Sequence, residues 1–122
     1  LAACHHLVIP VQTEYLALQG LERMIRTLQM ITRSRKESLT YTVVPTLFDK
    51  RTRASQQSLA TLKAKNGTYL SNTIIPVDTL FRDASQAGVP ISIKSPRSRG
   101  AIAYGELVEA LLRVGVSQSA VA

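Results

Sequence analysis

Short apolar runs alternate along this chain with longer stretches whose apolar residues recur at helical spacing. Residues 7–11 are continuously apolar but too few for a helix, which predicts a buried strand. In residues 14–34 the apolar side chains repeat every three or four positions, which predicts an amphipathic helix. The same reasoning predicts further strands at 39–47 and 73–76, further helices at 54–65, 78–87 and 98–114, and an extended connection at 89–97.

This alternation is typical of an α/β fold with a mostly parallel sheet and flanking helices. The chain has 122 residues, which suits a single core, and we expect one domain over residues 1–115 followed by a flexible tail at 116–122. In parallel sheets, ligands bind beyond the carboxyl ends of the strands. A binding site is therefore expected where residues 10–14, 45–53 and 76–82 meet.

The chain is strongly basic, with 15 Lys and Arg residues against 8 Asp and Glu and a net charge of +7. Such an excess favours an anionic partner, namely nucleic acid, a nucleotide or an acidic protein surface. The densest basic clusters lie in residues 50–53 and 94–99, and they could contact a phosphate backbone without reading its sequence. A solvated, charged loop is the alternative interpretation. Arg23, Arg26 and Arg33 fit the solvated face of the first helix better.

Cys4, His5 and His6 are the only Cys and His residues of the chain. A closed zinc site needs four ligands, and no further Cys or His can complete one, so we predict no metal site. A single Cys also excludes a disulfide framework. No apolar run approaches the roughly 20 residues that span a bilayer, and no signal-peptide pattern is present. We therefore expect a cytoplasmic location without a membrane anchor.

Two carboxylates at the predicted loops have a structural interpretation beside a functional one. Glu14 lies where a helix begins, a position that the helix dipole favours for an acid. Asp78 is placed to cap the helix that follows it. The acidic residues include no pair with an evident general acid–base arrangement, so no catalytic residue is predicted in this segment.

Four blocks of sequence carry a family resemblance. Residues 9–21 read IPVQTEYLALQGL, residues 49–52 read DKRT, residues 75–76 read IP and are followed by RDAS at 82–85, and residues 96–104 read PRSRGAIAY. In this order and spacing the blocks resemble those of ParA/Soj-type partition ATPases, of the deviant Walker A P-loop class. The resemblance extends over residues 1–112, nearly the whole chain.

The resemblance implies that this chain is the C-terminal half of such a protein, part of a P-loop NTPase fold. The intact protein would hydrolyse ATP with Mg²⁺, form a homodimer when ATP is bound, and position a chromosome, plasmid or other cargo through a ParB-like or cargo adaptor protein. It would work in the bacterial cytoplasm, at the nucleoid or a pole. The chain contains no G-x-x-x-x-G-K-[ST] motif. This segment alone is therefore expected to bind no cofactor and to be inactive.

The resemblance also assigns roles to single residues near the nucleotide. Thr46, Pro76 and Asp78 match positions that approach the adenine ring in the family. Glu14 and Tyr15 belong to a loop near the dimer interface and the nucleotide. These roles are expectations that the resemblance alone supplies.

A DNA-binding role falls on the basic loop. Arg51 aligns with an arginine that contacts the DNA backbone in the family, and Lys50 and Arg53 reinforce its charge. This chain departs from the family where Val77 and Leu80 replace arginines, one of them at a DNA-contact position.

This departure leaves other functions open. The intact protein could position a protein cluster, such as chemotaxis or polar machinery, in place of a DNA cargo. The alternative from another class is a stand-alone basic interaction module that binds no nucleotide.

Overall fold

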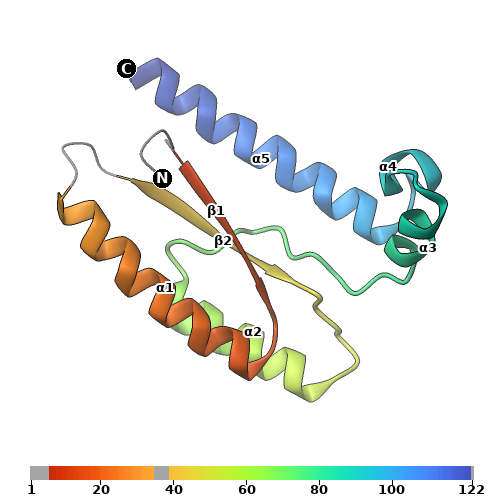
Figure 1. Ribbon diagram of the computed structural model, residues 1–122, viewed down its shortest axis with the longest axis horizontal. Coiled ribbons are helices and arrows are strands. Elements are labelled where there is room, and N and C mark those ends of the chain that lie inside the picture. Colours follow the sequence, from red (N-terminus) through yellow and green to blue (C-terminus); the bar gives the residue numbers. More distant parts are fainter. Residues whose placement is uncertain (1–5, 35–38, 122) are drawn as a thin grey trace.

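The computed structural model describes residues 6–34 and 39–121, with side chains as far as Arg113. Cys4 and His5 lie outside the described residues. Along the chain the elements are β1 (His6–Gln12), α1 (Tyr15–Ser34), β2 (Thr40–Thr46), α2 (Arg53–Asn66), α3 (Leu80–Ala87), α4 (Ile91–Lys94) and α5 (Arg99–Val121). Figure 1 shows α1 and α2 on one side of the strands and α5 on the other. The predicted α/β class with flanking helices is confirmed.

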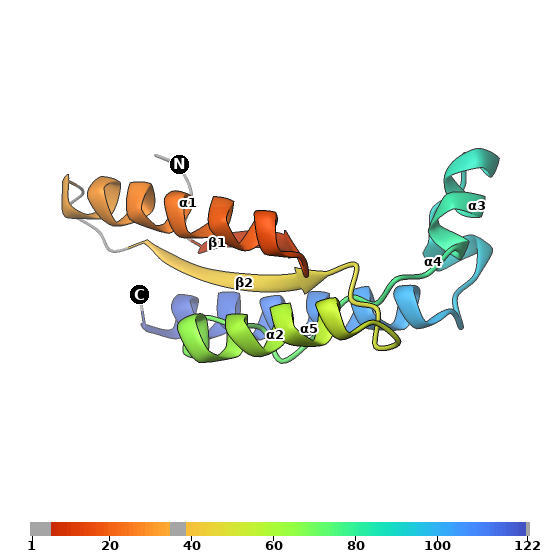
Figure 2. The same ribbon diagram turned by 90° about the horizontal axis from the view of Figure 1, so that it is seen from below.

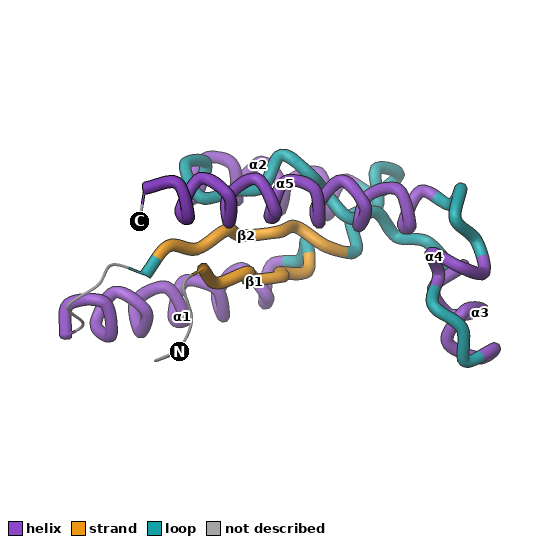
Figure 3. Tube along the Cα trace, turned by 90° about the horizontal axis from the view of Figure 1, so that it is seen from above, coloured by secondary structure: helices purple, strands orange, loops and turns teal. Residues whose placement is uncertain are grey.

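Strands β1 and β2 form a parallel, two-stranded sheet. The register pairs His6 with Thr40 at one end and Gln12 with Thr46 at the other. Both strands point toward the end of the molecule where α3 and α4 lie (Figures 2 and 3). No described strand pairs with the outer edge of β1, where Pro10 is exposed.

The predicted third strand does not form as a strand. Its segment forms no continuous ladder with β2: isolated parallel bridges join Val43 of β2 to Leu70, and Phe48, beyond the end of β2, to Pro76. After Ser71 donates its N–H to the Val43 carbonyl, a continuous ladder would need an N–H from Pro45, which proline lacks. The chain bulges outward there and rejoins β2 where Ile75 donates to the Pro45 carbonyl at 2.9 Å.

The core has one part on each face of the sheet. On the first face, Ile9 and Val43 pack with Leu21 and Leu28 of α1 and with Leu62 of α2. On the second face, Val44 and Ile75 pack against Ala103 and Leu107 of α5. The alternation of neighbouring residues such as Val43 and Val44 between the faces is that of a strand buried on both sides. Strand β2 is therefore the centre of the molecule.

Helix α5 differs from its prediction in two ways. The apolar spacing of this segment predicts Ile102, Val108 and Leu112 on the inward face, but they are exposed, since the narrow sheet covers only the strip around Ala103 and Leu107. The helix also continues to Val121, past the predicted end at residue 114. A glycine inside a helix costs only about 1 kcal/mol relative to alanine, so Gly115 does not end it.

The connection expected to be extended at residues 89–97 contains the short helix α4. Pro90 precedes it, and its carbonyl accepts the N–H groups of Ile93 and Lys94, both at 3.0 Å. The ring of proline presets a backbone angle that suits the start of a helix, which accounts for this turn.

Replacing Leu62 tests the core on the first face. Leu62 is only 1% exposed, so Leu62→Ala leaves a cavity and should lower the free energy of unfolding by about 2–5 kcal/mol in urea denaturation. Leu112 is 65% exposed, and Leu112→Ala should change that free energy by less than about 0.5 kcal/mol. Equal effects of the two substitutions would contradict this packing.

Candidate functional site

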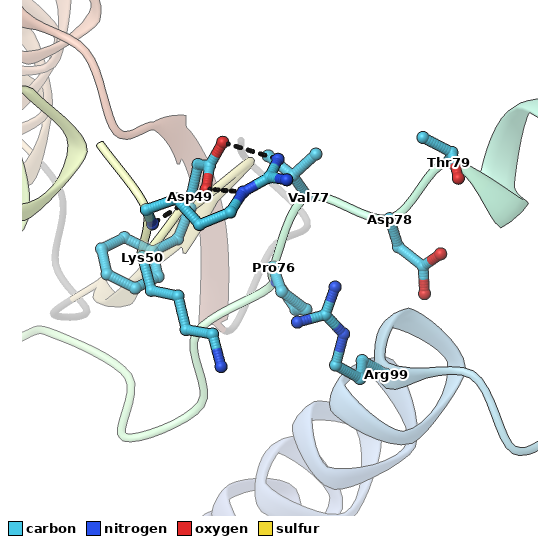
Figure 4. A pocket seen from close by; sticks show the side chains of 9 residues that line it. Asp49, Lys50, Pro76, Val77, Asp78, Thr79 and Arg99 are labelled. Atoms are coloured by element: carbon cyan, nitrogen blue, oxygen red, sulfur yellow. Dashed lines mark hydrogen bonds and ion pairs between the residues drawn. The ribbon is translucent and has the colours of Figure 1, made fainter.

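A cavity of about 290 Å³ lies beyond the carboxyl end of β2 (Figure 4). Three segments meet there: the loop after β2, the stretch that leads into α3, and the first residue of α5. Its apolar walls are Phe48, Pro76 and Val77, and its polar and charged lining is Asp49, Lys50, Arg51, Asp78, Thr79 and Arg99. Two of the three segments at which the sequence predicts a site, 45–53 and 76–82, line this cavity, whereas residues 10–14 do not.

The backbone bends at Leu47, where the loops of this cavity come together. Leu47 has a φ of 51° and is the only non-glycine residue with a positive φ in the described part of the chain. The left-handed region costs an L-residue about 1–2 kcal/mol. Phe48 follows this bend and pairs with the stretch before α3: its carbonyl accepts the Val77 N–H at 2.9 Å, and its N–H donates to the Ile75 carbonyl at 3.1 Å.

Asp49 and Arg51 form a two-point ion pair within the basic loop. Arg51 donates through Nε to Oδ1 at 3.0 Å and through Nη2 to Oδ2 at 3.2 Å, and its backbone N–H also reaches Oδ1. These hydrogen bonds hold the pKa of Asp49 below its usual value. The Arg51 side chain nevertheless stays 80% exposed, so its remaining N–H groups face solvent.

Asp78 ties the stretch before α3 to the start of α5. Its Oδ2 accepts the Gly100 N–H at 2.9 Å and its Oδ1 accepts the Leu80 N–H at 3.0 Å. These two backbone hydrogen bonds, helped by the nearby Arg99, lower the pKa of Asp78. Thr79 and not Asp78 occupies the N-cap position of α3, but Asp78 lies one residue earlier, holds the first N–H of α3 and also holds the first turn of α5.

Lys50 and Arg99 are the cations of the cavity that have no ion-pair partner among the described residues. Arg99 begins α5, and its guanidinium points toward Pro76 in Figure 4. Three cations, Lys50, Arg51 and Arg99, face two carboxylates, Asp49 and Asp78, in the lining, so the cavity carries a net positive charge. The site suits a ligand with an apolar ring and an anionic part.

A second hollow, a groove of about 530 Å³, separates the N-terminal turn of α1 from α2. Glu14, Tyr15 and Glu22 line it on one side, and Ser55 and Lys65 on the other. Lys65 and Glu22 form an ion pair at 2.7 Å across the groove. The groove keeps Glu14 and Tyr15 apart from the cavity.

The structure places the sequence-predicted residues in different positions. Pro76, Asp78, Lys50 and Arg51 line the cavity, whereas Thr46 and Arg53 do not.

His6, considered above as a metal ligand, has a structural role within the sheet. The imidazole of His6 bonds the hydroxyls of Thr40 and Thr42 at 2.6 and 2.7 Å, a structural contact across the sheet. Within residues 6–34 and 39–121, no group of three potential ligands could hold a metal. Thr13 and Ser55 carry no functional signal in the sequence, because their hydroxyls meet only in the folded chain.

The structure defines an α/β protein with a cavity beyond the carboxyl end of a parallel strand. The chain is 34% identical over 113 residues to "Chromosome-partitioning ATPase Soj" of Thermus thermophilus, covering 92% of this chain and 45% of that protein. It is 34% identical over 110 residues to "Sporulation initiation inhibitor protein Soj" of Bacillus subtilis (89% and 44%), and 26% identical over 113 residues to "Chromosome partitioning protein ParA" of Caulobacter vibrioides (92% and 42%).

These similarities confirm the resemblance found in the sequence: the chain is similar to ParA/Soj-type partition ATPases. It spans less than half the length of the curated relatives it matches, which is consistent with a C-terminal segment. No protein-family model matches the chain. No helix in the described part of the chain is long and apolar enough to cross a membrane.

Gly100 provides a test of the contact between α3 and α5. A Cβ at this position would overlap the Phe81 ring, so Gly100→Ala should lower the free energy of unfolding by about 1–3 kcal/mol. Gly105 lies in the same helix with open space around it, and Gly105→Ala should raise that free energy by about 0.4–1 kcal/mol. Urea denaturation measures both, and a destabilising effect of similar size at Gly105 would refute the assignment.

The carboxylate of Asp78 predicts a pH dependence. Its pKa is lower in the folded chain than in the unfolded chain, so the folded state binds fewer protons and this group stabilises it above the ordinary pKa of about 3.9. That stability is lost as the pH falls through the lowered folded pKa. Urea unfolding should therefore show Asp78→Asn as less stable than wild type at neutral pH, with a difference that shrinks below about pH 4. A constant difference would argue against the two hydrogen bonds.

Proposed function

We propose that this chain is the C-terminal segment of a ParA-like ATPase, which couples ATP-dependent dimerisation to the positioning of a chromosome, plasmid or other cargo. The observation that carries this proposal is the cavity between the basic loop and the stretch that leads into α3. It joins apolar walls to a net positive charge in a chain that is 34% identical to a protein named as a chromosome-partitioning ATPase.

The cavity fits the base of a nucleotide better than a whole nucleotide. Pro76 and Val77 offer flat apolar walls for a purine, and the volume of about 290 Å³ lies at the lower end of the range for ligand pockets. No glycine-rich phosphate loop occurs in the sequence, so the triphosphate and Mg²⁺ would be held by other residues of the intact protein. When ATP and Mg²⁺ are bound, hydrolysis of the ATP would return the dimer to its starting state.

The basic loop would supply the surface that dimerisation presents to DNA. Lys50, Arg51 and Arg53 are exposed, and the ion pair with Asp49 leaves part of the Arg51 guanidinium open to solvent. Lysine and arginine gain affinity for a phosphate backbone by releasing its counterions. Two such loops in one dimer would bind more tightly than either alone. A ParB-like or cargo adaptor would then act on the DNA-bound dimer in the bacterial cytoplasm.

The dimer contact would use the start of α1. Tyr15 and its neighbour Leu16 are both mostly exposed, which is unusual for two adjacent large apolar side chains. Glu14 precedes them at the rim of the groove. Burial of this turn against a second copy would bring the groove into the interface.

A protein cluster is the second candidate for the surface that is bound. Val77 and Leu80 stand where the family carries arginines, and Leu80 is partly exposed at the start of α3. This exchange of charge for apolar surface favours a protein contact on that side of the cavity. DNA and protein surfaces are distinguished by the test below.

Nucleotide contact is tested by photolabelling of the intact protein with 8-azido-ATP. The azide reacts next to the base, so the labelled peptide should contain residues 76–82, and an excess of ATP should suppress the label. Replacing Pro76 by Asp in the apolar wall should weaken ATP binding by about tenfold or more, because burying an unpaired charge is costly. Labelling elsewhere in the chain would remove the adenine site from this cavity.

DNA binding is tested by fluorescence anisotropy of a mixed-sequence duplex, with and without ATP, over a salt series. We expect binding in ATP that weakens steeply with salt, and a loss of about tenfold in Arg51→Ala through the lost phosphate contact. Arg23→Ala, which removes an exposed arginine from the outer face of α1, is the matched control and should change little. Absence of binding in both nucleotide states would move the surface to a protein cluster, and absence of nucleotide binding would leave a stand-alone basic module.

A further inference from the structure

The hydroxyls of Thr13 and Ser55 meet inside the molecule between two loops that the proposed function uses. Both residues are 6% exposed, and their oxygens Oγ1 and Oγ lie 3.2 Å apart. Thr13 directly precedes Glu14 and Tyr15 at the start of α1. Ser55 lies in the first turn of α2, directly after the basic loop. The contact therefore joins the proposed dimer loop to the proposed DNA-binding loop.

Donors and acceptors fix the direction of this hydrogen-bonded chain. The Asp49 N–H donates to Ser55 Oγ at 3.1 Å, so the Ser55 hydroxyl proton is free to be donated to Thr13 Oγ1. The Thr13 proton is then shared between the carbonyls of Thr46 and Leu47, at 3.1 and 3.2 Å. Each hydroxyl is used both as donor and as acceptor. Removal of one hydroxyl breaks the chain for all its members.

The chain of hydrogen bonds ends on the strained residue of the site. Leu47 has the left-handed φ of 51°, and its carbonyl is held by Thr13. The bend at Leu47 directly precedes Phe48, which pairs with Pro76, and both of these residues line the cavity. The conformation of Leu47 therefore affects the shape of the cavity. A backbone conformation that needs outside support can change when the support moves.

We propose that Thr13 and Ser55 are positioning residues that make the conformation of the basic loop depend on the loop at Glu14 and Tyr15. Movement of that loop, as dimerisation would cause, shifts Thr13, and the shift reaches Asp49 through Ser55 and Leu47. The groove beside them is lined by Tyr15 on one side and Ser55 on the other, so its closure would act on both. The inference rests on the proposed function for its biological meaning, but the contact between the loops can be tested separately.

The first test is amide hydrogen exchange of the intact protein. The Asp49 N–H bonds to Ser55 and not to Thr13, so a direct effect of Thr13→Val on Asp49 is not possible. Thr13→Val should nevertheless speed exchange in the peptide that contains Asp49 by about tenfold, because Ser55 loses its acceptor and holds the Asp49 N–H less firmly. Thr13→Ser should restore the wild-type rate, and Thr27→Val, at an exposed threonine of α1, is the matched control. Unchanged exchange at Asp49, or faster exchange everywhere, would overturn the proposal.

The second test is the ratio of DNA affinities with and without ATP. In Thr13→Val and in Ser55→Ala this ratio should fall about tenfold while the affinity for ATP stays unchanged, since the coupling is lost and not the site. A purely structural role would leave the ratio as in wild type once the protein is folded. If wild type itself shows no dependence on ATP, the proposed function fails, and hydrogen exchange still decides whether Thr13 positions the loop.

Discussion

The parallel pairing of β1 and β2 is the contact on which the rest of this structure depends. Parallel neighbours cannot be joined by a tight turn, so the chain must return over the sheet, and α1 is that crossover. The return brings the carboxyl ends of both strands to one edge. Thr13 after β1 and residues 47–55 after β2 then lie together, although 34 residues separate Thr13 from Leu47 along the chain. The site is a consequence of this topology.

Much of this arrangement could be predicted from the sequence because it depends on local pattern. The continuous apolar run of β1, the periodic stripe of α1 and the end of α3 at Ala87 each reflect the conformation of a few neighbouring residues, and the structure has them where they were expected. Two of the predicted nucleotide contacts and two of the predicted DNA contacts also line one cavity. They do so because the carboxyl ends of parallel strands converge.

The features that escaped prediction depend on contacts across the fold. Pro45 was visible in the sequence, but its effect follows only when β2 is central and the missing N–H faces the segment at Ser71. In the same way, the apolar pattern of α5 does not tell how wide a sheet the helix will meet, and Ile102 and Leu112 are exposed for that reason. The meeting of Thr13 and Ser55 has no signal in the sequence, since each is a common residue at a helix start.

The two carboxylates of the cavity, Asp49 and Asp78, hold backbone in place and also contribute to its charge. Asp78 accepts backbone N–H groups at two helix starts and Asp49 pairs with Arg51, while the charges of both carboxylates also act on Arg99. Both carboxylates have lowered pKa values and stay ionised, and their work is to hold backbone in place. Without them, the loop at Lys50 and the first turn of α5 would lose their anchors. The lining still has three cations, Lys50, Arg51 and Arg99, against these two carboxylates, so the loops that the acids hold in place present a net positive charge to a ligand.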